Sequence, residues 1–125
     1  KTGLTMITVV NREYCKKLLI SRPGQNHPEQ YHKKKEETFV VLYGDVQLKL
    51  DGVLRSLQKG DVVTIESGVR HEFTTEGGCV IEEVSSTHYL DDSFYTDETI
   101  AENKNRKTHL TQWTGWDLLK ADKIK

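Results

Sequence analysis

The sequence predicts an all-β domain, folded as an antiparallel sandwich or barrel. Short runs of β-branched or alternating apolar residues recur along the first hundred positions. Turns that contain glycine separate these runs, and no long helical pattern lies between them. Many short strands at this spacing are typical of a closed or two-layered antiparallel sheet. With 125 residues, the chain can bury one core but is too short for two domains.

The predicted strands follow from the side-chain patterns. β-branched residues dominate 4–10, and 45–50 alternates apolar with polar residues. Alternation in 79–85 places Glu83 on one face and Glu82 on the other, so one of these carboxylates must face the interior. The predicted strands are 4–10, 14–21, 38–43, 45–50, 53–57, 62–65, 71–75 and 79–85.

Glycine-containing turns join these strands. Pro23-Gly24 combines a preset φ with a residue that accepts positive φ. Asp51-Gly52 predicts a tight hairpin turn, because both residues tolerate left-handed conformations. Further turns are predicted at 60–61, 66–68 and 76–78.

The composition changes near Thr87, after which the chain is polar with scattered aromatic residues. We expect residues 1–100 to form the barrel and 101–125 to form a tail that packs on it. A short helix is predicted over 113–124.

Charge and composition exclude several classes of partner. The chain has 18 basic and 19 acidic residues, so no nucleic-acid or anionic-membrane partner is expected. No apolar run approaches the ~20 residues of a membrane span, and the chain opens without an apolar leader, so we expect a cytoplasmic protein. Cys15 and Cys79 do not form a disulfide framework and are predicted to be small buried residues.

Side chains typical of metal ligands lie in the segment 23–44 and around His71. On an extended segment, residues two apart share a face, so Gln30 and His32 can reach one ion. Glu37 comes from the next pass of the backbone. The turns on either side of the strand before His71 can carry this histidine back to the same place.

This donor set suits a divalent first-row metal. His32, Glu37 and His71 are the predicted core ligands and leave positions open for substrate oxygens. The alternative is that each histidine is a hydrogen-bonded polar group in a strand. Gln30 either adds its carbonyl oxygen as a fourth ligand or hydrogen-bonds a ligand or water. We expect manganese, with iron, zinc, cobalt and nickel as alternatives.

The first block resembles a motif of the cupin superfamily, a group of small jelly-roll barrels that hold a metal ion inside. That motif reads His-x-His, three or four residues, Glu, six residues, Gly. Here Gln30-x-His32 is followed by four residues and Glu37, then by six residues and Gly44. Gln30 stands where the family has its first histidine.

The second block resembles the second cupin motif, which is Gly, five residues, Pro-x-Gly, two residues, His. Gly60, Gly68 and His71 match it, and Glu66 stands in place of the proline. The resemblance implies an antiparallel jelly-roll barrel with a C-terminal extension.

Further blocks are similar to the D-lyxose isomerase group of cupins. They are YCKKL, PGQ, HPEQYH, KKEETF, RHEF, EEVSST and FYTDETI, in this order over about 14–100. The resemblance implies an aldose–ketose isomerase that works through an enediol, with Glu83 as catalytic base. By the same resemblance, Lys17 stabilises or protonates a substrate oxygen. Without it, Lys17 would be interpreted as a solvated lysine on an edge strand.

Two other functions remain open. Similar cupin modules occur at the end of sialic acid synthases and other nucleotide-sugar pathway proteins, so the chain can be a non-catalytic sugar-binding module of such a protein. Two histidines and one carboxylate also form the facial triad of iron-dependent oxygenases, and a dioxygenase is the second alternative. The expected partner is a small sugar, and the need to cover edge strands favours a homodimer.

Several other polar and aromatic residues are predicted to have structural roles. The lysines at 33–35 are predicted to form a solvated turn rather than a phosphate-binding patch. His27 and His88 are interpreted as surface histidines, with the mouth of the barrel as the alternative. Tyr31, Tyr43 and Phe73 are predicted to lie in the core or wall rather than to take part in chemistry.

Overall fold

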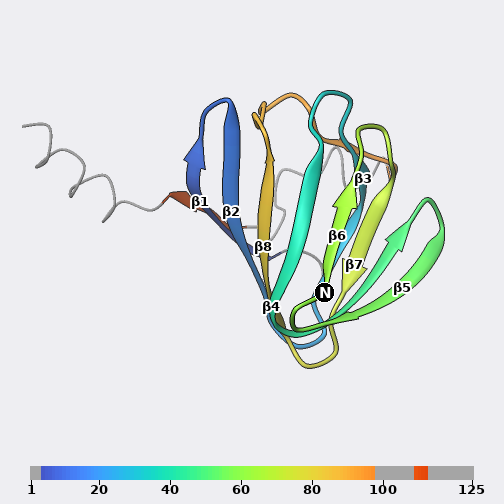
Figure 1. Ribbon diagram of the computed structural model, residues 1–125. Helices are drawn as coiled ribbons and strands as arrows, with labels where there is room; N and C mark the ends of the chain where they lie inside the picture. Colours follow the sequence, from blue (N-terminus) through green and yellow to red (C-terminus); the bar gives the residue numbers. More distant parts are fainter. Residues whose placement is uncertain (1–3, 98–108, 113–125) are drawn as a thin grey trace, which may run out of the picture.

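The computed structural model describes residues 4–97 and 109–112, and each regular element in these ranges is a β-strand. The strands are β1 (Thr5–Asn11), β2 (Tyr14–Ser21), β3 (Asn26–Tyr31), β4 (Glu37–Leu50), β5 (Val53–Gln58), β6 (Val62–Ile65), β7 (His71–Thr74), β8 (Cys79–Ser86), β9 (Phe94–Tyr95) and β10 (His109–Gln112). They converge at one end of the molecule and spread apart at the other (Figure 1). The predicted all-β barrel class is confirmed.

Strand β4 belongs to both sheets of the barrel. Its first half pairs with β6 and β8, and this larger sheet continues through β2 and β1 to β10. Its second half pairs with β5 and β7, and the smaller sheet continues through β3 to β9. All described pairs are antiparallel except β1 with β10. The two sheets therefore meet along one bent strand.

The structure confirms the predicted strands, with boundaries that differ by at most one residue, except that two of them are one element. The predicted strands 38–43 and 45–50 form the continuous β4, because Gly44 bends the chain at φ 82° without ending the ladder. Strands β3, β9 and β10 were not predicted: β3 contains a proline and lacks a β-branched run, and β9 has two residues. The predicted helix over 113–124 lies outside the described residues.

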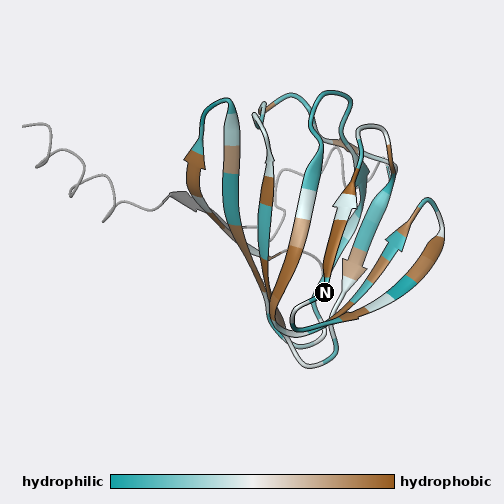
Figure 2. Cartoon of the chain, in the orientation of Figure 1, coloured by the Kyte–Doolittle hydropathy of each residue, from teal (hydrophilic) through white to brown (hydrophobic). Residues whose placement is uncertain are grey.

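The core lies where the strands converge. Its buried hydrophobic residues are Leu4, Leu19, Phe39, Val41, Val46, Leu48, Ile65, Phe73, Cys79 and Ile81. Figure 2 shows the first half of β4 changing from hydrophilic at its upper end to hydrophobic at its lower end. The barrel thus has an apolar base, which leaves polar side chains for the opposite end. Cys15 and Cys79 are free and buried, as predicted.

The prediction for Tyr43 is wrong, whereas Phe73 is a core residue as predicted. The pairing of β4 with β8 shifts register between Val41 and Tyr43. This bulge turns both Leu42 and Tyr43 outward, and the Tyr43 side chain is 64% exposed. Phe73, in contrast, is 2% exposed.

Gly44 allows the bend of β4 to lie close to the turn between β7 and β8. A Cβ atom at this position would lie 1.9 Å from the backbone oxygen of Gly78. The backbone is also in the left-handed region, at φ 82°. Gly52, in the turn after β4, has nearly the same φ of 83°, but a Cβ there would meet no atom within 4 Å.

We therefore predict that Gly44→Ala destabilises the protein far more than Gly52→Ala. Gly52→Ala should cost about 1–2 kcal/mol, which is the strain of a left-handed alanine. Gly44→Ala adds a backbone collision and should cost more than about 3 kcal/mol. Chemical denaturation of both variants measures the difference, and equal losses would contradict this account of the bend.

Asp45 ties the turn between β7 and β8 to β4. Its carboxylate accepts hydrogen bonds from the Glu76 amide at 3.0 Å, the Gly77 amide at 2.9 Å and the Thr75 hydroxyl at 3.4 Å. The two amides hold the pKa of Asp45 below its usual value. The stabilisation is complete above the unfolded-state pKa of about 3.9 and is lost as the pH falls through the lower folded-state pKa.

Asp45→Asn should therefore destabilise the protein at pH 7, and the difference from wild type should shrink below about pH 4. Urea unfolding at pH 7, 5, 4 and 3 measures this convergence. Asp91→Asn, at an exposed position, is the control. A difference that stays constant over the whole range would contradict the role of the charge.

Within the described residues, no helix is long and apolar enough to cross a membrane.

Candidate metal centre

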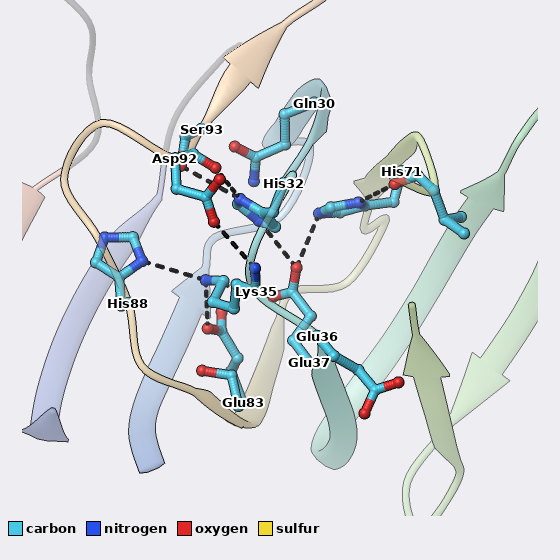
Figure 3. A network of polar contacts seen from close by, with 12 residues as sticks. Gln30, His32, Lys35, Glu36, Glu37, His71, Glu83, His88, Asp92 and Ser93 are labelled. Carbon is cyan, nitrogen blue, oxygen red and sulfur yellow. Dashed lines mark hydrogen bonds and ion pairs between the residues drawn. The ribbon is translucent and has the colours of Figure 1, made fainter. Parts of the chain in front are cut away.

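Three buried donor side chains converge between the two sheets. His32 directly follows β3, Glu37 begins β4 and His71 begins β7. Glu37 Oε2 lies 3.0 Å from His32 Nε2 and 3.2 Å from His71 Nε2. One ligand atom from each residue lies within 4.8 Å of the other two, and no side chain of the three is more than 4% exposed. Figure 3 shows both imidazoles facing the same carboxylate.

Strand pairing explains why residues so far apart in sequence meet here. Gln30 pairs with His71 across β3 and β7, which places His71 beside the end of β3. The Gly68 amide donates a hydrogen bond of 2.6 Å to the His32 carbonyl, so the turn before β7 is tied to the same place. Glu37 arrives from the larger sheet, at the first residue of β4.

Each histidine turns its Nε2 atom toward Glu37. His32 Nδ1 lies 2.7 Å from the Asp92 carbonyl oxygen, and His71 Nδ1 lies 3.0 Å from the Val69 carbonyl oxygen. A carbonyl oxygen can only accept, so in neutral imidazoles the proton is on Nδ1 and the lone pair is on Nε2. The tautomer is assigned from these contacts.

When both imidazoles are neutral, the convergent atoms are therefore all electron-pair donors. His32 Nε2, Glu37 Oε2 and His71 Nε2 are buried, and within the described part of the chain none has a well-aligned hydrogen bond. Buried acceptors without a proton between them are unfavourable unless a cation joins them. Two donors held at about 2.1 Å from one ion and at right angles are about 3 Å apart, close to the measured separations. The residues fit a divalent metal ion.

Electrostatic interactions in the cluster also favour a cation. Burial alone would raise the pKa of Glu37, but His32, His71 and Lys35 hold that pKa well below its usual range. Burial alone would lower the pKa of His71, and the Glu37 carboxylate raises it instead. The carboxylate thus stays ionised, and a proton and a metal ion would compete for the same imidazole nitrogen.

Gln30 lies beside these donors and contacts a third buried histidine, His27. Gln30 is 9% exposed, and its amide nitrogen lies 3.4 Å from His27 Nε2. The surface interpretation of His27 is wrong, because its ring is 3% exposed and stacks on Phe73 at 5.4 Å. Burial lowers the pKa of His27 to about 4, so a neutral His27 accepts the amide hydrogen of Gln30.

The lysine turn differs from its prediction at one position. Lys33 and Lys34 are exposed, as a solvated turn requires, but Lys35 is 3% exposed. Its Nζ lies 2.9 Å from Glu83 Oε2 and 3.8 Å from Glu37 Oε1. Lys35 points inward because two buried carboxylates need a cation between them.

Glu83 and Lys17 face the same interior. Alternation along β8 buries Glu83 and leaves Glu82 on the outer face, where Glu82 pairs with Lys16 at 2.8 Å. Lys17 lies opposite Glu83 in the ladder of β2 and β8 and is 3% exposed. The edge-strand interpretation of Lys17 is wrong, since β2 lies between β1 and β8.

The pKa values of this second pair move in opposite directions. Burial lowers the pKa of the Lys17 ammonium, although Glu83 opposes the shift. Burial and the Glu37 charge raise the pKa of Glu83, against Lys35 and Lys17. A raised carboxyl pKa brings Glu83 closer to the range in which a base works near neutral pH.

Sequence reasoning gave no role in the site to three residues of this interior: Lys35, His88 and Asp92. Lys35 and Glu37 are two residues apart, so the spacing that paired Gln30 with His32 would also have indicated Lys35. His88 Nδ1 lies 3.3 Å from Lys35 Nζ, and burial lowers the pKa of His88 to about 4. No local pattern marks His88 or Asp92, because both lie in the irregular connection after β8.

Comparison with known proteins defines the family. Residues 18–83, more than half of the chain, match the family described as the cupin domain. The chain belongs to the cupin family, as its two motifs predicted.

One relative has a sugar isomerase name. A D-lyxose/D-mannose isomerase from Thermosediminibacter oceani is 30% identical over an alignment 128 positions long. The alignment covers 79% of this chain and 71% of that protein. A polyketide synthase CurC from Streptomyces cyaneus is 34% identical over 77 residues, covering 62% of this chain and half of that protein's length.

A solved structure gives the same fold. KdgF from Halomonas sp. superposes with a TM-score of 0.66 at 18% identity, covering 71% of this chain and 83% of that one. This likeness supports the barrel architecture.

We predict that Glu37→Gln lowers affinity for a divalent metal by at least about 100-fold, because it removes the negative donor of the three. Glu36→Gln, the exposed neighbour, should bind as wild type. Thermal unfolding measures the effect: wild type at an ion concentration of 100 times its Kd should gain about 2.7 kcal/mol, or at least about 5 °C. Equal shifts in both variants would contradict the site.

Proposed function

We propose that this chain is a metal-dependent aldose–ketose isomerase acting on a sugar of the D-lyxose or D-mannose type. The observation that carries the proposal is the buried carboxylate of Glu83, which Lys35 links to the donor Glu37 within one interior. The relative named as D-lyxose/D-mannose isomerase supports the choice of reaction and substrate.

His32, Glu37 and His71 would hold the ion, with Gln30 as a fourth ligand through its carbonyl oxygen. Manganese is the expected metal; iron, zinc, cobalt and nickel are alternatives. When bound, the ion would supply a Lewis acid for the carbonyl and hydroxyl oxygens of the sugar.

Glu83 would act as the base. It would remove the proton from the carbon next to the carbonyl and return it to the former carbonyl carbon, passing through an enediol. The hydroxyl proton moves to the neighbouring oxygen, and the Lys17 ammonium would donate a hydrogen bond to a substrate oxygen. Lys35 would keep the Glu83 carboxylate oriented through its contact at 2.9 Å.

The proposal includes the predictions from the sequence about the partner, the oligomeric state, the location and the domain limits. A small sugar would be the partner, the protein would act as a homodimer, and its location would be the cytoplasm. Residues 1–100 would form the catalytic barrel, and 101–125 would pack on it.

The decisive comparison uses two adjacent glutamates. With manganese present, wild type should convert D-lyxose or D-mannose to the corresponding ketose. Glu83→Gln should lower kcat by at least about 100-fold without loss of metal, because the general base is gone. Glu82→Gln, on the outer face, should keep wild-type activity. Failure of wild type to form ketose from any pentose or hexose would contradict the proposal.

The two-histidine, one-carboxylate donor set favours an iron-dependent oxygenase as the second candidate. Oxygen uptake by the iron-loaded protein with a candidate substrate would identify it. Tight sugar binding without turnover would instead indicate a non-catalytic sugar-binding module. Gln30, which stands where the family has a histidine, favours this alternative function.

A further inference from the structure

Asp92 lies in the connection between β8 and β9 and is 2% exposed. Its carboxylate accepts hydrogen bonds from three consecutive backbone amides: Lys33 at 3.0 Å, Lys34 at 3.1 and 3.2 Å, and Lys35 at 3.0 Å. Both carboxylate oxygens are used, and the turn after β3 is wrapped around them.

Three amides pointing at one place form a concave site for an anion. A carboxylate suits it because both oxygens accept. An asparagine would turn one NH₂ group toward the amide hydrogens, and a serine would be too short to reach all three. The contacts thus require the charge and shape of an aspartate.

The amide contacts set where the lysine side chains go. Lys33 Nζ lies 4.4 Å from the centre of the Phe94 ring, and Lys34 Nζ lies 4.8 Å from that of Tyr89. With these two directed outward onto aromatic rings, Lys35 turns inward to Glu83. The turn held by Asp92 also connects His32 to Glu37 along the chain.

The main chain of Asp92 acts on the metal centre directly. Its carbonyl oxygen is the acceptor, 2.7 Å away, for His32 Nδ1. Figure 3 shows Asp92 and Ser93 beside His32, on the side away from Glu37. One residue thus holds the turn with its side chain and directs the His32 ring with its backbone.

We propose that Asp92 is a positioning residue of the metal centre: its carboxylate holds the 33–35 turn so that His32 presents Nε2, and Lys35 its ammonium, to Glu37. This inference rests on the proposed metal site. Asp92 does not touch the ion and acts through His32 and the turn, as outer residues do in many metal sites.

The test uses Co²⁺ as the probe and compares Asp92→Asn with Asp91→Asn, the exposed neighbour. Titration is done at a temperature where all three proteins are fully folded by circular dichroism. Asp92→Asn should bind Co²⁺ 10- to 100-fold more weakly, on the scale of about 10–100 found for outer residues, with a changed ligand-field spectrum. Asp91→Asn should match wild type in both.

A residue that only stabilises the fold would change the melting temperature and leave the affinity and spectrum of the folded protein unaltered. Wild-type affinity and spectrum in folded Asp92→Asn would therefore overturn the proposal.

A second measurement on metal-free wild type keeps the test valid if Asp92→Asn does not fold or if no ion binds. Nitrogen NMR should show the His32 ring protonated at Nδ1, and the amides of residues 33–35 should exchange at least about 100-fold more slowly than unprotected amides. Fast exchange at all three amides, or a His32 ring that lacks a proton on Nδ1, would overturn the positioning role. Failure of wild type to bind Co²⁺ would count against the metal site alone.

Discussion

The organisation of this barrel's interior depends on the Glu37 carboxylate. A charge buried between two sheets is unfavourable unless cations or hydrogen bonds compensate it. One Glu37 oxygen has the Lys35 ammonium at 3.8 Å, and the other faces the Nε2 atoms of the His32 and His71 imidazoles. The contact with Lys35 links Glu37 to Glu83, because the same ammonium also contacts the Glu83 carboxylate. The contact with the two imidazoles forms a donor set that could hold a metal ion. The metal-type donors and the proposed catalytic groups are thus one electrostatic unit.

The fold presents Glu37 by bending one strand through both sheets. Gly44 lets β4 begin in the larger sheet, beside β8 and Glu83, and continue in the smaller sheet, beside β7 and His71. The apolar base of the barrel and the polar interior at its other end are therefore joined through the same element. Asp92 completes the arrangement from the connection after β8, by holding the turn that leads into β4.

Much of this arrangement could be predicted from local patterns. Alternation in β8 is enough to place Glu83 inside and Glu82 outside, and turn residues on both sides of β6 explain the return of His71. Lys35 was misplaced because three adjacent lysines suggest solvent, whereas burial here is imposed by carboxylates on other strands. The places of Asp92 and His88 depend on tertiary contacts with the 33–35 turn and with Asn11 at the end of β1, and the short β9 depends on its pairing with β3. No local period encodes these contacts.

The most direct test of the account is the anomalous scattering of crystals grown with Mn²⁺. We expect one strong peak within bonding distance, about 2.0–2.3 Å, of His32 Nε2, Glu37 Oε2 and His71 Nε2. The same crystals of His71→Ala should lack it. A peak bound elsewhere, or an interior without a peak at saturating Mn²⁺ while these three side chains keep their places, would contradict the central claim.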